Sequence, residues 1–147
     1  MHPFDPKSVL LAKHAQHVVL VHFPIALYIA GVFFDFVSRG KKQSAFATAA
    51  YFNLSLAALS TVPVIATGLL AWQFALEGQK IKGVLLLHLV FALASSLLIC
   101  LSWWIHRQAR RASGDSLPGF RLALEALTVC LVAVTGHLGG FLSGINV

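Results

Sequence analysis

The chain has 147 residues, of which 58% are hydrophobic and only 11% are charged, and its formal net charge is +6 at pH 7. A soluble domain has about 25% charged residues, so this composition excludes a soluble enzyme, a disordered chain and a secreted disulfide-bonded scaffold. The two cysteines form no C-x-x-C pair, which leaves no signature of a zinc ribbon, an iron–sulfur cluster or a covalently attached haem.

Four apolar runs are long enough to cross a bilayer core of about 30 Å. Transmembrane strands alternate polar and apolar residues over about ten positions, whereas these runs are continuous, which favours helices. Short loops make neighbouring spans antiparallel, so the predicted fold is all-α, an integral membrane four-helix up-down-up-down bundle forming a single domain over residues 1–147. The predicted spans cover about residues 17–38, 45–76, 83–105 and 120–142.

The first span follows a polar segment, residues 1–16, that lacks the apolar stretch of a cleavable signal. We therefore expect the first span to remain in the mature protein. Pro24 removes a backbone donor inside this span and predicts a kink. The second span contains Pro63 and is longer than one upright helix needs, so it is expected to tilt or bend. The third ends in Trp103 and Trp104, which predict an interfacial aromatic belt.

Basic residues are distributed unequally between the two sets of loops. The loops after the first and third spans hold Arg39, Lys41, Lys42, Arg107, Arg110, Arg111 and Arg121, whereas the opposite side holds Lys7, Lys13, Lys80 and Lys82. The positive-inside rule makes the richer side cytoplasmic. We therefore predict a multi-pass protein of the bacterial inner membrane with both termini on the outer, periplasmic side. Nucleic-acid binding is not expected, because no basic stripe is interleaved with aromatic residues.

Histidines of three predicted spans lie at one depth. His22 and His88 are each five residues inside the outer end of their span, and His137 is about five residues inside the end of the fourth. At 1.5 Å per residue, all three lie roughly 7 Å below the same membrane face. His17 is about one and a half turns nearer the surface. Because ionisable side chains inside a membrane mark functional sites, they predict a cofactor or metal site. The alternative is that these histidines only stabilise the bundle through hydrogen bonds.

Haem b suits such a bundle because two imidazoles on opposite helices can bind its iron. The first and third helices of an up-down-up-down bundle are diagonal, so we predict one haem b near the outer face, with His22 and His88 as axial ligands. A non-haem metal ion bound by the same histidines is the competing interpretation, although the sequence offers no carboxylate at this depth. The predicted cofactor-binding residues are His22, His88, His137, His17, Gly136 and Gly139, with His137 and His17 as runner-up ligands.

The opposite ends of the spans hold the remaining ionisable residues. His106 lies beside the two tryptophans of the third span and is interpreted as an interfacial anchor. Asp35 and Glu125 are expected to pair with Arg39 or Arg121, since Arg121 and Glu125 are spaced i,i+4. Proton entry through these acids is the alternative to structural pairing.

Two motifs resemble those of a known family. Residues His17–Leu27 contain two histidines five apart, the second in a His-Phe-Pro-Ile step, and resemble the opening signature of a bacterial membrane family catalogued as domain of unknown function 2231. Residues Thr135–Gly140 resemble its closing motif. Thr67–Ala71 is similar to its second block, and His88 matches the histidine of its third helix.

This resemblance covers about residues 14–142, nearly the whole chain. It implies four helices and a shared set of histidines at positions 17, 22, 88 and 137. The architecture is also similar to that of membrane b-type cytochromes, which suggests haem by analogy. One departure from the family pattern is Val18, where a proline often follows the first histidine.

The predicted function is that of a membrane-embedded haem b electron-transfer protein that is a subunit of a larger redox complex. The protein would pass electrons from quinol or another membrane carrier to an electron carrier on the outer side. Only His106 is available near the cytoplasmic face, so no second haem is expected, and other membrane redox subunits would be needed to cross the bilayer. A cofactor-free structural accessory subunit remains the alternative. The sequence favours a carrier or accessory subunit over a stand-alone enzyme.

Overall fold

The computed structural model describes residues 15–39, 45–74, 76–112 and 117–144. Within these ranges the chain is helical and contains no strand. The helices are α2 (Ala15–Leu20), α3 (His22–Val37), α4 (Ala45–Phe74), α5 (Gly83–Arg111) and α6 (Arg121–Leu142). Segments long and apolar enough to cross a membrane are Gln16–Val37, Ala45–Phe74, Gly83–Arg111 and Arg121–Leu142. The prediction of an all-α membrane bundle with four long apolar helices is confirmed.

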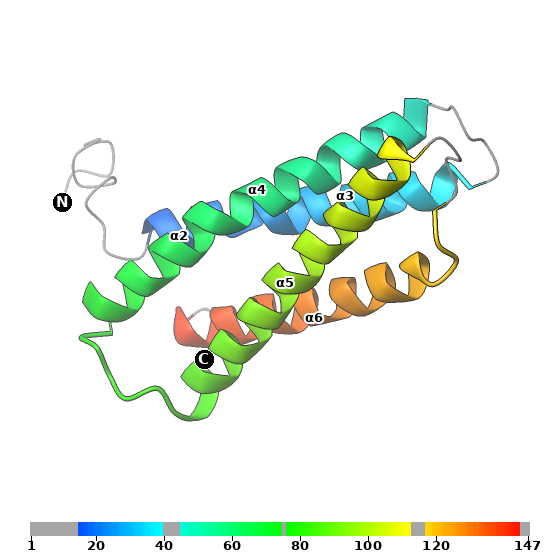
Figure 1. The fold of residues 1–147 in the computed structure, drawn as a ribbon. Coiled ribbons are helices and arrows are strands. Elements are labelled where there is room, and N and C mark those ends of the chain that lie inside the picture. Colours follow the sequence, from blue (N-terminus) through cyan, green and yellow to red (C-terminus); the bar gives the residue numbers. More distant parts are fainter. Residues whose placement is uncertain (1–14, 40–44, 75, 113–116, 145–147) are drawn as a thin grey trace.

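The four spans run lengthwise beside one another (Figure 1). Each packs against the next along the chain, and α3 also contacts α6, which closes the bundle. At one end α2 begins, α4 ends, α5 begins and α6 ends; we call this the histidine end because it contains His17 and His88. At the other, the basic end, α3 ends beside Arg39, α5 ends at Arg111 and α6 begins at Arg121.

The first span is interrupted at Val21, between α2 and α3. Pro24 explains the interruption, because proline has no N–H to donate to the carbonyl four residues earlier and its ring crowds that carbonyl. The Val21 amide still donates to the His17 carbonyl at 3.0 Å. By contrast, Pro63 lies inside α4 without interrupting it.

The third span continues beyond its predicted end at residue 105. Helix α5 extends to Arg111, so Arg107, Arg110 and Arg111 lie on its last turns and their prediction as loop residues is wrong. Cations at a helix C-terminus interact favourably with the helix dipole. The guanidinium of Arg107 also lies over the Trp103 ring at 5.3 Å, and that of Arg110 over the Tyr51 ring at 4.5 Å. Both contacts are of the cation–π type and favour continued helix.

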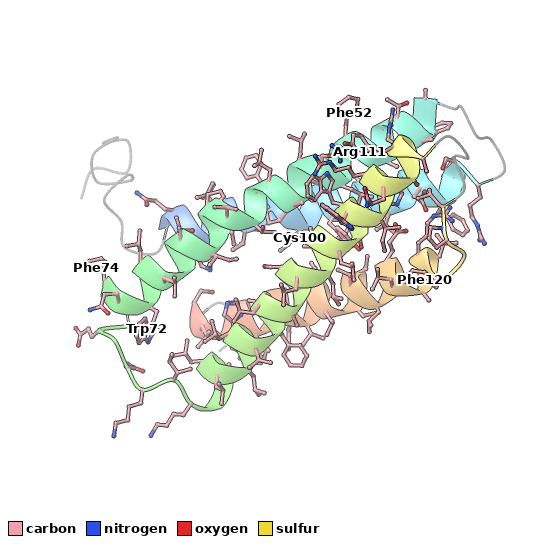
Figure 2. The ribbon with its side chains drawn as sticks, viewed as in Figure 1. Phe52, Trp72, Phe74, Cys100, Arg111 and Phe120 are labelled. Carbon is pink, nitrogen blue, oxygen red and sulfur yellow. The ribbon has the colours of Figure 1, made fainter. Side chains whose placement is uncertain are left out.

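The apolar core is small, and most large apolar side chains face outward. The buried cluster consists of Tyr28, Leu54, Ala57, Ala58, Ile99 and Val132. Figure 2 shows Phe52 and Phe74 pointing away from the bundle, and these side chains are 59% and 57% exposed. Lipid is as apolar as these side chains, so helix association in a membrane depends on close packing and on interhelical hydrogen bonds.

Gly31 allows α3 and α4 to approach closely. A Cβ atom at this position would lie 2.9 Å from the Leu54 side chain and 3.2 Å from the Leu54 backbone nitrogen. Because the backbone atom cannot move aside without shifting α4, the absence of a side chain at Gly31 sets the spacing of the two helices.

Substitution of Gly31 by alanine is expected to destabilise the bundle by about 1–3 kcal/mol, as overpacking does in other tightly packed cores. The matched control is Gly136→Ala, because a Cβ atom there meets no other atom within 4 Å. Thermal unfolding in detergent micelles should show a lower midpoint for G31A and an unchanged or higher midpoint for G136A. Equal midpoints for the two variants would show that α3 and α4 do not pack this closely.

Candidate functional site

All four spans line a cavity of about 80 Å³ toward the histidine end. Two imidazoles contribute to it, His17 from α2 and His88 from α5. No carboxylate or thiol lines this cavity among the described residues, and the rest of its surface is mainly apolar. Its polar lining consists of His17, Thr61, His88, Ser95, Ser96 and Thr135.

The imidazole of His17 is held by α4. Its Nδ1 lies 3.2 Å from the Thr67 hydroxyl oxygen, and that hydroxyl donates its hydrogen to the Pro63 carbonyl at 2.9 Å. The Thr67 oxygen therefore accepts from His17, which places the imidazole proton on Nδ1 and the lone pair on Nε2. A Cβ atom at Gly68 would lie 3.0 Å from the His17 ring, so glycine makes room for this imidazole.

The imidazole of His88 is held by α6 in a similar way. Its Nδ1 donates to the Thr135 carbonyl at 3.1 Å, and since a carbonyl only accepts, the lone pair of His88 is again on Nε2. A Cβ atom at Gly139 would lie 3.2 Å from the His88 ring. Each histidine of the cavity therefore lies against a threonine and a glycine of another span. These residues are on α4 for His17 and on α6 for His88.

The other histidines of the predicted site do not line this cavity. His22 is exposed, and its Nδ1 donates to the Val18 carbonyl at 2.7 Å within the same span. His137 is also exposed, with its ring packed edge-on against Phe141. His17 and His22 lie on either side of the interruption at Val21, and only His17 faces the cavity. The structure thus brings His17, rather than His22, to the same cavity as His88.

The two predicted glycines have different surroundings. Gly139 contacts the His88 ring, whereas Gly136 has open space where a side chain would be. The absence of a side chain at Gly139 therefore leaves room for the His88 ring, whereas Gly136 has no such role.

A second polar cluster lies at the basic end, which we call the acid–histidine cluster (Asp35, His106, Glu125 and Arg121). His106 Nε2 lies 2.9 Å from Glu125 Oε1 and 4.0 Å from Asp35 Oδ1. Arg121 Nε donates to Asp35 Oδ2 at 2.9 Å. Asp35, His106 and Glu125 are 1%, 4% and 1% exposed. Three helices therefore direct ionisable side chains to one buried point.

Sequence reasoning missed this cluster as a unit. The expected pairing of Asp35 with Arg121 is confirmed, but the interpretation of His106 as an interfacial anchor is wrong, since its imidazole is buried against Glu125. The signal that could have revealed the cluster was the depth of its residues in the membrane, measured from the helix ends. Asp35, His106 and Glu125 all lie within about five residues of the helix ends at the basic end, the same criterion that grouped the histidines of the other end.

The acid–histidine cluster is not balanced in charge or in hydrogen bonding. Among the residues that the structure describes, two carboxylates face one guanidinium, and Glu125 Oε2 is buried without a hydrogen-bond partner. One ligating atom from each of Asp35, His106 and Glu125 lies within 4.8 Å of the others. This set of donors could hold a metal ion.

Comparison with known proteins finds one family. The family described as Predicted membrane protein (DUF2231) matches residues 13–144. No curated protein and no solved structure matches the chain.

Replacing Arg121 by methionine is expected to lower the free energy of unfolding by about 3 kcal/mol, because it leaves the buried Asp35 carboxylate without its cation. This is near the lower end of the effect for a buried pair, since the Arg121 side chain is 13% exposed. Arg39→Met is the control, because Arg39 is exposed and stacks over Phe36.

Denaturation in micelles measures both variants. The double variant D35N/R121M should be more stable than the sum of the two single losses predicts, because it removes both charges of the pair. Strict additivity would contradict a direct interaction between Asp35 and Arg121.

Proposed function

We propose that this chain, which belongs to the DUF2231 family of predicted membrane proteins, is an electron-transfer protein that holds one haem b between His17 and His88. The observation that carries the proposal is the cavity lined by one imidazole from α2 and another from α5. Residues far apart in the sequence thus supply two nitrogen donors to the same cavity.

The donor set of the cavity favours haem over other metal centres. The hydrogen bond of His88 to a carbonyl leaves its lone pair on Nε2, where imidazole can ligate iron, and His17 contributes a second imidazole to the same cavity. Carboxylates and thiolates, which compact zinc or di-iron centres commonly require, do not line the cavity among the described residues. Haem iron bound by two histidines shuttles between its ferric and ferrous forms and so carries one electron.

The neighbours of the two histidines would orient and tune them as ligands. A metal-ligating histidine commonly donates its second N–H to a carbonyl or another acceptor, which fixes the ring and raises its basicity. Thr67 plays this part for His17 and the Thr135 carbonyl does so for His88. More basic ligands stabilise ferric iron, so these bonds favour a lower reduction potential.

Haem binding requires the cavity to expand. Pockets for drug-sized ligands have volumes of about 300–1,000 Å³, whereas this cavity has about 80 Å³. The apolar side chains that line it, including Val21, Ile25 and Val64, would have to move apart for a porphyrin to enter. The cavity supplies nitrogen donors that suit the cofactor, and its lining is mainly apolar, as a porphyrin ring requires.

A single haem at one end of the bundle could not carry electrons across the whole membrane. The distribution of lysine and arginine favours an outer, periplasmic location for the histidine end in a bacterial inner membrane. Electrons would then pass between quinol or another membrane carrier and an outer-side electron carrier. Transfer across the whole bilayer would need further redox subunits, so the chain would act within a larger complex.

An optical spectrum of the purified protein tests this proposal. We expect a Soret band and, after reduction, an α band from haem b. His17→Ala and His88→Ala should each abolish both bands, because each removes an imidazole that would hold the iron, whereas His22→Ala and His137→Ala are controls that should retain them. Loss in H22A with retention in H17A would restore the pair His22 and His88. A wild-type protein without these bands after expression with added haem would refute the function itself.

Thr67→Val tests the role of the hydrogen bond to His17. Loss of the acceptor makes His17 a less basic ligand, so haem affinity should fall about tenfold and the midpoint potential should become more positive. Thr61→Val is the matched control, because Thr61 lines the same cavity but donates to the Ala58 carbonyl of its own helix. Haem titration and redox titration measure the two effects, and identical values for T67V and T61V would contradict this role.

A further inference from the structure

We propose that Asp35, His106 and Glu125 form a second site, which binds a divalent transition-metal ion such as Zn²⁺ at the basic end of the bundle. This site is separate from the histidine cavity and shares no residue with it. Its donors come from α3, α5 and α6, and all three residues are at least nine-tenths buried.

The donor atoms already have nearly the spacing of a metal site. Zinc binds imidazole nitrogen and carboxylate oxygen at about 2.0–2.2 Å, which places tetrahedral ligands about 3.4 Å apart. The observed separations of His106 Nε2 from Glu125 Oε1 and from Asp35 Oδ1 are 2.9 and 4.0 Å. These two values bracket the ideal spacing, and all three donor atoms lie within 4.8 Å of one another. Coordination would require the side chains to shift and the proton of His106 Nε2 to be displaced by the metal ion.

The buried, unpartnered oxygen of Glu125 supports a metal ion as a further partner of the cluster. The cluster carries two carboxylates and one guanidinium, so with a neutral His106 one negative charge is in excess. A proton on His106 would cancel this charge, but Glu125 Oε2 would still be buried without a partner. A metal ion uses carboxylate lone pairs directly, and one bound through both oxygens of Glu125 would give Oε2 a partner as well as Oε1.

Arg121 positions one of the ligands. Its Nε holds Asp35 Oδ2, while Asp35 Oδ1 is directed toward His106. Hydrogen-bonded partners of this kind orient metal-ligating carboxylates. Other arginines of the basic end lie over aromatic rings instead, Arg39 over Phe36 and Arg107 over Trp103.

Three protein ligands would leave one position of the metal open. Zinc with three protein ligands holds water or another small ligand in its fourth position. An anionic fourth ligand would also balance the charge, because a divalent ion changes the sum of the cluster from one excess negative charge to one excess positive charge. The ion would crosslink three helices at the end of the bundle opposite His17 and His88.

The test is zinc binding by the full-length protein, purified without a polyhistidine tag and freed of metal by a chelator. We expect one tightly bound Zn²⁺ per chain by elemental analysis and titration, with X-ray absorption reporting one imidazole and oxygen ligands. Glu125→Gln, which keeps the shape of the side chain, and His106→Ala should each weaken binding at least tenfold.

Two controls separate this site from other binding. Glu77→Gln removes an exposed loop carboxylate and should leave zinc affinity unchanged. His88→Ala removes a histidine of the other cavity and should also leave it unchanged. Equal zinc affinity in wild type and E125Q, or loss of zinc in H88A together with retention in H106A, would overturn the proposal. So would a wild-type protein that retains no zinc, which would leave proton binding as the state of the cluster.

Discussion

A polar side chain inside a membrane-spanning helix has to find its partner within the bundle, because lipid supplies none. This constraint explains most of the side-chain geometry described here. Ser55 and Thr128 bond to carbonyls one turn earlier in their own helices. His17, His88, His106 and Asp35 instead bond to groups on other spans. These cross-helix contacts determine which face of each helix turns inward.

The two ends of the bundle satisfy this constraint with different chemistry. At the histidine end, neutral imidazoles donate to a hydroxyl and a carbonyl, and the neighbouring glycines provide space. At the basic end, two buried carboxyl groups face an imidazole and a guanidinium. Between them, Tyr28 bonds to Ser102 at 2.7 Å and Ser95 bonds to Thr135 at 3.2 Å. Interhelical polar contacts are therefore distributed along the interior between the two ends.

The number of helices and the depth of the ionisable residues could be predicted from the sequence, because hydropathy and distance from a helix end are local properties. The direction of each side chain around its helix could not. Whether His17 or His22 faces inward depends on the interruption at Val21 and on the position of Thr67 on another helix. His106 was misassigned for a similar reason, since only the packing of α5 against α3 and α6 brings it to Asp35 and Glu125.

Helix α5 contributes an imidazole to both ends of the molecule. His88 and His106 are 18 residues apart, which is about five full turns and about 27 Å along the axis. The two rings therefore project from the same side of one rigid rod, together with Ser95, Ile99 and Ser102. A rotation of α5 about its axis that moved one ring out of the interior would therefore move the other ring out as well. The positions of the two imidazoles thus depend on the orientation of one helix.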